Sequence, residues 1–470
     1  LNRVMGQRTL GGKIFFQGKP ASNPSLAWTL AAVSGREIIV PPNPGAMGAW
    51  GIGLCATYQT GQKALHVAPK LDVAAILAAE ITDRSEFQCN DPKCQTLCPI
   101  ERTTITVDGQ SREALSGGAC PKFEVSTKAQ PKLDKEAPNP FERRKALIES
   151  FIRSDSERPV TAIPQIGALS GHIPWLATFV HELGFAVELL RSKSSSLALG
   201  EQLSNSFDSC GPVKIAHAVC DTSAQRLFLP KILSIADPQG SGGQTCVSEQ
   251  ALPEMIEQSL KSRGKDVKVI RPRLSFADGF DSPELLANLM EIAGDLGVDP
   301  DRIGKAAEVA GRAQIQYEEG LAGIGQEALD YARAHDLPSV VLCGHIHVVS
   351  DPSINANIPL LLRQNGAMAI PMDCLPIAND SATIEKIYWG DDRRYLRAAV
   401  AARQSADGFP LLLASFGCGP CSFTEQIFQA LLEGYPHTIL ESDGHGGAAG
   451  FVTRIQAFLQ AVRQFIAQND

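Results

Sequence analysis

From Arg158 onward the sequence alternates short apolar runs with amphipathic segments, and this alternation limits the possible folds more than any other feature. RPVTAIPQIG is typical of a buried strand, IPWLATFVHELG of a helix that ends at Gly184, and FAVELLRS of the next strand. Strands that alternate with helices form parallel sheets covered by helices. The sequence therefore predicts an α/β fold.

The same alternation resumes after a long helical stretch. Residues 284–336 have a helical pattern almost throughout, and Ser282 is suited to cap its start. A second series of strands begins at SVVLCGHIH and continues through AMAIPMD, PLLLASFG and HTILESDG to a terminal helix. A chain of 470 residues is longer than one hydrophobic core usually supports. We therefore expect two Rossmann-like parallel-sheet lobes, lobe I at residues 155–300 and lobe II at 301–470.

Three segments of different character precede the lobes. Residues 1–57 contain strand-like and helix-like pieces and a Gly-rich helix start, which predicts a small α/β piece. Residues 58–130 are polar and include four cysteines, whereas 131–154 are rich in Pro, Lys and Glu and are typical of a linker. The chain begins at Leu1 without Met, which indicates a processed chain or a piece of a longer protein.

The net charge and the cysteine content argue against some classes of function and favour metal binding. The net charge is −8 and no basic block is present, so nucleic acid is a poor candidate partner. No apolar run reaches 18 residues and no signal peptide is apparent, so we expect a cytoplasmic protein without a membrane span. In a reducing compartment, twelve cysteines are better suited to hold metal than to form disulfides.

The first cysteine group has the spacing C-x4-C-x3-C-x21-C. Its members lie in a short, loop-rich segment that has too few apolar residues for a core of its own: Cys89, Cys94, Cys98 and Cys120. Four thiolates in such a segment suit tetrahedral zinc or a [4Fe-4S] cluster, and bound metal would supply the missing folding energy. The spacing alone does not decide between zinc and iron.

The second cysteine group is dispersed along the two lobes. Its members are Cys210, Cys220, Cys246, Cys374, Cys418 and Cys421. Several follow apolar strands and stand beside Gly or Pro, at the carboxyl ends of strands where open α/β sheets bind ligands. Cys220 lies on a helical face and is equally suited to the core. Cys55 and Cys343 lie within apolar runs, so we expect both to be buried packing residues.

The stretch FGCGPCSF joins an apolar strand to a helix. Gly417, Gly419 and Pro420 allow a tight turn there, which would present Cys418 as a thiolate near the backbone amides of the helix start. A cysteine at such a turn is either a ligand or a small buried side chain.

Other residues whose side chains could take part in catalysis stand singly or in pairs in the sequence. His345 and His347 alternate at a strand end and would either orient a substrate or be ordinary surface groups. His445, near two carboxylates in ESDGHGG, is a candidate acid or base. Lys214 is close to Cys210 and would either offset the negative charge of a cluster or be solvated.

Four motifs resemble a known family. DSCGPVKIAHA, CGHIHVVSDPSINANIPLLL, FGCGPCSF and SDGHGGAAGFVTRIQAFL resemble elements of the uncharacterised domain attached to activases of the 2-hydroxyacyl-CoA dehydratase and benzoyl-CoA reductase system. The resemblance runs over most of residues 87–470 and extends to the Cys89 group. It departs from the family pattern where Cys421 replaces an Asp and where Gly344-His345 replaces Gly-Arg.

The resemblance implies a cofactor and its ligands. Cys210, Cys246 and Cys418 would hold a [4Fe-4S] cluster between the lobes, as in dehydratases that bind a cubane by three cysteines. With Cys220, Cys374 and Cys421 the thiols number six, as in double-cubane [8Fe-9S] proteins. The implied function is ATP-coupled, low-potential electron transfer and reduction or reductive dehydration of a small or CoA-linked substrate. His345, His445 and Lys214 are the catalytic candidates.

The amino-terminal piece is similar to the carboxyl end of an activase ATPase of the actin, sugar-kinase and Hsp70 class. The phosphate-binding hairpins of that class are missing, so ATP would act only through a partner activase or an amino-terminal domain outside this sequence. Two alternatives stay open, a zinc-stabilised binding or assembly module and a regulatory fragment of an activase ATPase. A homo-oligomer is compatible with either.

Overall fold

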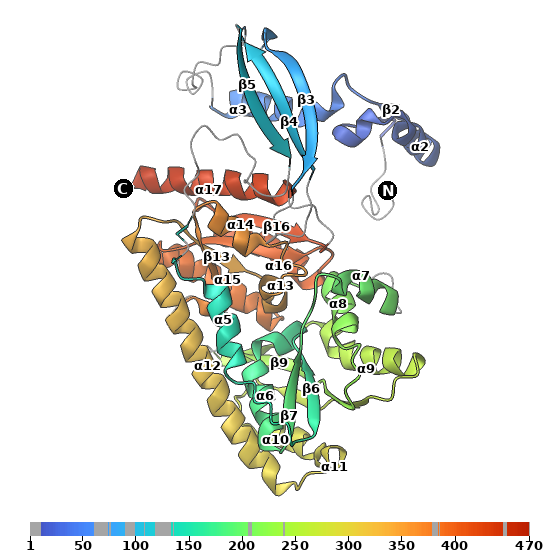
Figure 1. Ribbon diagram of the computed structural model, residues 1–470, viewed down its shortest axis with the longest axis vertical. Coiled ribbons are helices and arrows are strands. Elements are labelled where there is room, and N and C mark those ends of the chain that lie inside the picture. The colour runs from blue at the N-terminus through green and yellow to red at the C-terminus, as the bar shows by residue number, and fades with distance from the viewer. Residues whose placement is uncertain are drawn as a thin grey trace. The chain divides into compact units, whose positions relative to one another are not determined.

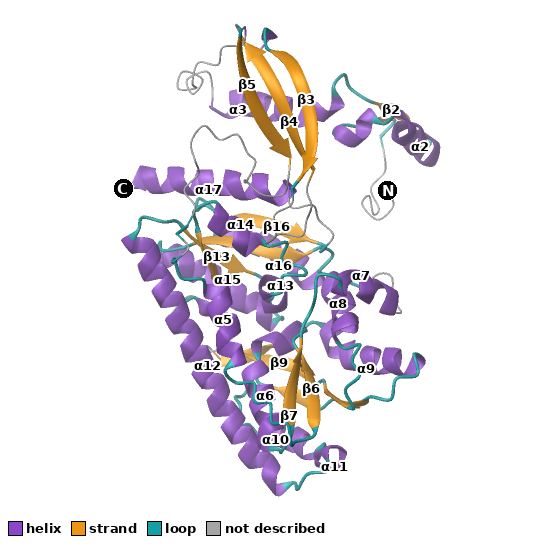
Figure 2. Ribbon diagram, viewed as in Figure 1, coloured by secondary structure: helices purple, strands orange, loops and turns teal. Residues whose placement is uncertain are grey.

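A computed structural model describes residues 11–60, 74, 77–89, 99–107, 109–117, 133–134, 136–204, 209–237, 240–377, 384, 386–444 and 449–469. The chain divides into two compact units, one made of Leu1–Glu80 and Ile105–Ser111, the other of Ile81–Thr104 and Arg112–Asp470. The architecture is mixed α/β with several sheets of parallel strands, as the sequence predicts (Figures 1 and 2).

The amino-terminal segment is a small α/β piece. Strands β1 (Lys13–Phe15) and β2 (Glu37–Ile39) pair in parallel, and helix α2 (Pro24–Ser34) connects them. The side chain of Asn23 caps α2 by accepting a hydrogen bond from the Ser25 N–H, and Gly35 ends the helix in the left-handed region. Short 3-10 helices η1 (Lys19–Ser22) and η2 (Pro44–Ala46) and helix α3 (Met47–Thr60) complete the segment.

The segment expected to be loop-rich is largely a three-stranded sheet. Its strands pair in the order β3-β4-β5 and span Glu80–Gln88, Pro99–Val107 and Gln110–Gly117. The run TTITV in β4 is rich in β-branched residues, which favour strands. Arg84 and Glu101 form a two-pronged ion pair between β3 and β4. The loop-rich expectation was therefore wrong for these strands.

Lobe I is built on a four-stranded parallel sheet. Its strands follow the order β11-β8-β6-β7 and span Lys268–Ile270, Arg226–Phe228, Val160–Pro164 and Ala186–Leu190. The helices of the lobe are η5 (Gly167–Gly171), α6 (Ile173–Glu182), α7 (Ser196–Leu203), α8 (Gly211–Val219) and α9 (Val247–Ser262). A smaller sheet joins β10 (Gly240–Gln244), β9 (Lys231–Asp237) and β12 (Arg273–Ser275).

Lobe II is built on a second four-stranded parallel sheet. Its strands follow the order β14-β13-β15-β16 and span Met368–Pro371, Ser339–Cys343, Phe409–Ser415 and Thr438–Ser442. The helices of the lobe are α13 (Ile346–Ser350), α14 (Ile358–Gln364), η6 (Met372–Cys374), α15 (Gly390–Ser405), α16 (Gly419–Leu431) and α17 (Ala449–Asn469).

The two main sheets share one topology. Numbered along the chain, the strands of each sheet lie in the order 2-1-3-4, so each has a switch point between its first and third strands. These strands are β6 and β8 in lobe I, and β13 and β15 in lobe II. Open α/β sheets bind ligands beyond the carboxyl ends of the strands at such points. We therefore expect a ligand at this edge of each lobe.

One long helix packs on both lobes. Helix α12 (Asp301–Ala334) contacts α6 in lobe I and β14 and η6 in lobe II (Figure 1). The shorter helices α10 (Pro283–Met290) and α11 (Ala293–Leu296) precede it. Helix α5 (Pro140–Glu149) packs against α12, although its residues fall in the predicted linker. The buried face of α5, which includes Ile148, makes it part of the core.

Two glycines of α12 provide a test of this packing. A Cβ at Gly325 would overlap the carbonyl oxygen of Cys374, whereas a Cβ at Gly323 would meet nothing. We expect Gly325→Ala to lower the free energy of unfolding by about 2 to 3 kcal/mol through overpacking. Gly323→Ala should raise it by about 0.5 to 1 kcal/mol, because Ala is the better helix former. Urea unfolding of both variants measures the difference, and equal effects would contradict the packing of α12 on η6.

A buried histidine should make stability depend on pH. His172 lies at the start of α6, donates a hydrogen bond from Nδ1 to the Ala168 carbonyl at 3.0 Å and stacks on Phe276. Burial lowers the pKa of His172 to about 4. Its neutral form is therefore favoured in the folded state, and the stability it contributes is present above pH 6.5 and lost as the pH falls from 6.5 to 4.

We expect this histidine to remove about 2.5 kcal/mol from the free energy of unfolding between pH 7.5 and pH 4.5. Urea unfolding at several pH values measures the loss. His172→Gln keeps a donor at this position but does not titrate, so its stability should fall less over the same interval. Parallel pH curves for the two proteins would count against this origin.

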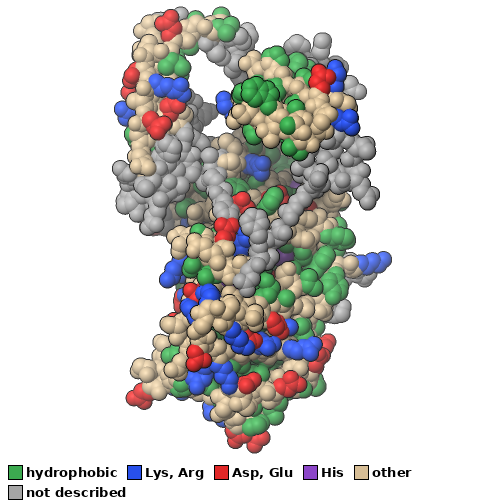
Figure 3. All heavy atoms as spheres, turned by 90° about the vertical axis from the view of Figure 1, so that its right-hand side faces the viewer, with side chains coloured by type: hydrophobic (Ala, Val, Ile, Leu, Met, Phe, Trp, Pro, Cys, Tyr) green, Lys and Arg blue, Asp and Glu red, His purple; other side chains and the backbone are tan. Residues whose placement is uncertain are grey.

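Within the part of the chain that the structure describes, no helix combines the length and apolar character needed to cross a lipid bilayer. Over the lower part of the face in Figure 3, Lys and Arg side chains are interspersed with Asp and Glu side chains.

Candidate functional site

Three cysteines far apart in the sequence line one cavity at the carboxyl edges of the two sheets. Cys210 and Cys246 reach it from lobe I, and Cys418 reaches it from lobe II. The rest of the lining includes Gly167, which follows β6, and two histidines, which follow β13. The cavity is thus formed where the switch points of both sheets lead us to expect a ligand.

Each of the three cysteines stands at the start of a helix. Cys210 is the N-cap residue of α8, Cys246 of α9 and Cys418 of α16. The backbone N–H groups at such positions have no partner within the helix, and the helix dipole adds partial positive charge. Helix starts of this kind favour anionic groups, including thiolates.

Local sequence explains how Cys418 reaches the cavity. Gly417 has a φ of 74°, a conformation that side chains with a Cβ disfavour, and it turns the chain after β15. Pro420 stands in the first turn of α16, where a missing N–H costs nothing. The FGCGPCSF turn therefore forms as the sequence predicts.

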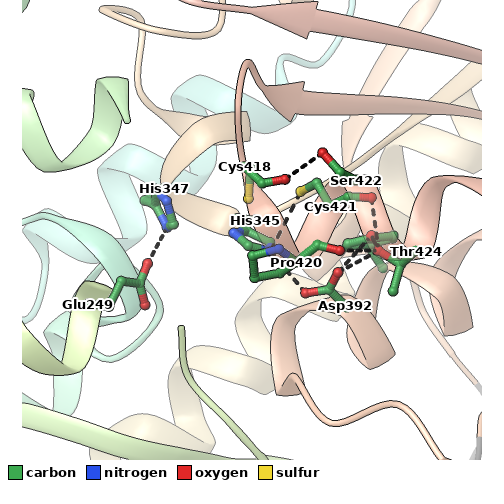
Figure 4. Close-up of polar contacts among 10 residues, drawn as sticks. Glu249, His345, His347, Asp392, Cys418, Pro420, Cys421, Ser422 and Thr424 are labelled. Carbon is green, nitrogen blue, oxygen red and sulfur yellow. Dashed lines mark hydrogen bonds and ion pairs between the residues drawn. The ribbon is translucent and has the colours of Figure 1, made fainter. Parts of the chain in front are cut away.

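A buried ion pair lies beside the Cys418 thiol. His345 Nε2 lies 3.0 Å from Asp392 Oδ2, and both side chains are buried (Figure 4). Burial lowers the pKa of His345, but the hydrogen bond and the charge of Asp392 outweigh it and hold that pKa well above its ordinary value. Asp392 is fixed by donors on Tyr395, at 2.9 Å, and Thr424, at 2.6 Å. His345 is therefore a positive charge held in a set orientation.

The thiols of Cys418 and Cys421 shift each other's pKa in opposite directions. Cys421 donates a hydrogen bond to Cys418, which lowers the pKa of Cys418 to about 6 against the opposing effect of burial. The positive charge of His345 lowers this pKa further. The same hydrogen bond, together with burial, holds the pKa of Cys421 well above its ordinary value. Cys418 is the thiolate of this pair and Cys421 is the thiol.

A second acid and base pair faces the cavity. Glu249 Oε1 lies 3.3 Å from His347 Nδ1, and both groups line the cavity (Figure 4). Burial raises the pKa of Glu249 to about 8, and the charge of Asp391 adds to this effect. Burial and the charge of His345 lower the pKa of His347 to about 3. Near pH 7, Glu249 therefore carries a proton inside the cavity and His347 is neutral.

The sulfur and nitrogen donors form a compact group. Among the described residues, the ligand atoms of His345, Cys418 and Cys421 lie within 4.8 Å of one another, close enough to hold a metal ion. A histidine that binds metal must be neutral, whereas His345 is held protonated by Asp392. The electrostatics favour His345 as a counter-charge over a direct ligand.

Two of the six predicted cluster thiols lie elsewhere. Cys220 ends α8 and is fully buried among apolar side chains, where burial raises its pKa. Cys374 ends η6 beneath α12 and is also buried in the core. Neither is among the residues that line the cavity. The structure brings together Cys210, Cys246, Cys418 and, behind it, Cys421.

Lys214, which the sequence offers as a catalytic candidate, lies on α8. Its Nζ forms an ion pair with Glu201 of α7 at 3.0 Å, and the lysine is not among the residues that line the cavity. His445 lies outside the described residues.

The first cysteine group is described in part. Cys89 follows β3 directly and is a free, half-buried thiol, whereas Cys94, Cys98 and Cys120 lie outside the described residues. The metal site predicted from these four cysteines stays a prediction.

Of the two cysteines expected in the core, one is buried and the other is exposed. Cys343 is buried at the end of β13, as predicted, but Cys55 is exposed on α3. The apolar run around Cys55 includes Ile52, which is also exposed, so hydrophobicity alone misplaced this residue.

Sequence reasoning missed two residues of the site. Asp392 follows Gly390 in the first turn of α15, and Glu249 stands three residues after Cys246 in the first turn of α9. Acidic residues are common in the first turn of a helix because they complement its dipole. That common role hid the fact that Glu249 lines the cavity beside His347 and that Asp392 pairs with His345.

Part of the chain that forms this site matches a known protein family. Residues 162–375 match the family model of the CoA enzyme activase uncharacterised domain. The match confirms the resemblance to activase-related proteins that the motifs indicate. It contains Cys210, Cys246 and His345, whereas Cys418 lies beyond it. No curated protein matches the chain.

Proposed function

We propose that this protein is an iron–sulfur component of an acyl-CoA dehydratase or reductase activation system. The observation that carries the proposal is the presence of Cys210, Cys246 and Cys418 around one cavity, although up to 207 residues of the chain lie between them. The match to the CoA enzyme activase uncharacterised domain supports the same system.

The chemistry of the donors fits a [4Fe-4S] cluster. Cysteine thiolates are the usual ligands of such clusters, and three of them at helix starts match its negative charge. The free volume among them, about 30 Å³, is room for about two waters, so the cysteine-bearing turns would have to move apart around a cluster. Glycines on both sides of Cys418 allow such a movement.

Residues around the thiolates would set the electrostatics of the site. The imidazolium of His345, fixed by Asp392, lies close to Cys418 and would stabilise the more negative, reduced state. The proton held by Glu249 is available to a substrate in the cavity. A bound cluster would supply low-potential single electrons.

The partner and the substrate follow from the same reasoning. Electrons would come from an ATP-dependent activase, either a separate protein or a fused domain, and the Cys89 group, if it holds a second cluster, would lie on their route. The electron acceptor would be a small or CoA-linked substrate, or a dehydratase that binds one. The double-cubane alternative requires Cys220 and Cys374 to leave the core, so we favour the three-thiolate site.

A zinc site is the second candidate. It is supported by the compact group of His345, Cys418 and Cys421, whose nitrogen and sulfur donors suit zinc. Zinc binding there would require His345 to lose its proton and weaken its bond to Asp392. This cost makes zinc the weaker proposal.

Anaerobic purification of the full chain tests both proposals. We expect a brown protein with absorption near 400 nm, with about four iron and four sulfide per occupied cluster. A colourless protein with about one zinc per chain would favour the zinc module. A protein that binds neither metal under anaerobic reconstitution would overturn both.

A further inference from the structure

The turn between β15 and α16 carries a closely spaced pair of thiols, Cys418 and Cys421. Residues at positions i and i+3 face each other on a helix, and Cys418 caps the helix on which Cys421 occupies the first turn. Their sulfur atoms lie within 4.8 Å of each other. Rotation about the side-chain bonds can close this separation to that of a disulfide.

The context of the pair is that of a redox dithiol. A C-x-x-C sequence that follows a parallel strand and opens a helix within a β-α-β unit is the arrangement of disulfide oxidoreductase sites. The two cysteines also differ in access: Cys418 is partly exposed, whereas Cys421 is 2% exposed. An outer cysteine that reacts first and an inner one that resolves are the two parts that thiol–disulfide exchange needs.

We propose that Cys418 and Cys421 form a reversible dithiol–disulfide couple that reacts with low-molecular-weight disulfides. A further consequence, which rests on the proposed function, is that the disulfide removes Cys418 from the ligands of the cluster. The couple would then report the redox state of the cell at the cluster site.

Thiol–disulfide exchange between this pair and oxidised glutathione takes two steps. The Cys418 thiolate attacks one sulfur of oxidised glutathione, forms a mixed disulfide and releases one glutathione thiolate. The Cys421 thiol then loses its proton, attacks the Cys418 sulfur and releases the second glutathione, which takes up that proton. The protein gives up two electrons as the Cys418–Cys421 bond forms, and one disulfide becomes two thiols.

A redox titration of the full chain tests the couple. Metal is removed with a chelator, the protein is equilibrated at graded ratios of reduced to oxidised glutathione, and free thiols are then alkylated. Peptide mass spectrometry should show a Cys418–Cys421 disulfide whose fraction follows a single two-electron curve. Cys421→Ser should instead accumulate glutathione on Cys418, and Cys55→Ser should match the wild type.

Two results would overturn the couple. One is a disulfide from Cys418 to Cys210 or Cys246 in place of Cys421, and the other is full alkylation of both thiols at every ratio. Iron uptake tests the further consequence: the disulfide form should bind about four fewer iron atoms per chain than the reduced form, and a reductant should restore binding. Equal iron uptake by both forms would overturn it.

The two proposals can fail separately. If the reduced protein binds no iron, the proposed function fails, and the titration still decides whether the couple exists. If iron binds and no Cys418–Cys421 disulfide forms, only the couple is wrong.

Discussion

Cys418→Ser is expected to lower the iron and the sulfide bound by the anaerobically reconstituted protein by about four atoms of each per chain, because the cavity cluster is lost while the Cys89 group is unchanged. The loss of one of three thiolates leaves a second iron of the cluster without a protein ligand, and a serine hydroxyl is rarely deprotonated near neutral pH. The absorption near 400 nm should fall in proportion. The same losses are expected for Cys210→Ser and Cys246→Ser, because all three thiols line the cavity.

Cysteines outside the cavity supply the controls. Cys55→Ser changes an exposed thiol on α3 and should leave the iron content unchanged. Cys374→Ser separates three-thiolate from six-thiolate binding. We expect it to lower stability while the iron per chain stays the same, because Cys374 is buried in the core. Loss of iron from Cys374→Ser would instead support the double-cubane site, and loss from Cys55→Ser would discredit the measurement.

Arg144→Met is expected to lower the free energy of unfolding by about 3 to 5 kcal/mol. Arg144 Nε of α5 lies 2.8 Å from Asp373 Oδ2 of η6, and the two side chains are 3% and 5% exposed. Removal of the guanidinium leaves a buried carboxylate without its partner. The double variant Arg144→Met/Asp373→Leu should recover most of the loss, because it removes both charges.

The adjacent residue is a matched control for this ion pair. Arg143 on the same helix pairs with Glu327 at the surface, where both side chains are about half exposed. Arg143→Met should change the free energy of unfolding by less than about 1 kcal/mol. Urea unfolding of the four proteins gives all the values. Similar losses for Arg143→Met and Arg144→Met would show that the buried pair has no special role.

The sequence predicted the fold best where its signal is repeated. Two series of buried strands and amphipathic helices gave both parallel-sheet lobes, because burial on both faces of a strand leaves a continuous apolar run. Helix α5 was hidden in a segment rich in Pro and charge. Its helical state depends on packing against α12, a tertiary effect that local composition does not carry.

The candidate site was predicted in part for a related reason. Cys210, Cys246 and Cys418 each stand at a strand or loop end, and Cys210 and Cys418 also stand beside Gly. Topology suggested that the dispersed thiols converge, and the family resemblance singled out these three. The sequence around Asp392 and Glu249 gives no indication that they belong to the site, because their roles arise from contacts with His345 and His347. Cys220 and Cys374 carry the same residue type as the cavity thiols but face the core.

The continuity of α12 has a mechanical consequence. Because a single unbroken helix packs on α6 of lobe I and on β14 and η6 of lobe II, the lobes cannot separate as two domains joined by a flexible linker could. A relative movement of the lobes that widens the cavity would then be a rotation about α12, whereas the glycine-flanked turn at Cys418 can move locally. Binding of a group that moves the lobes would then change the contacts that α12 makes with both of them.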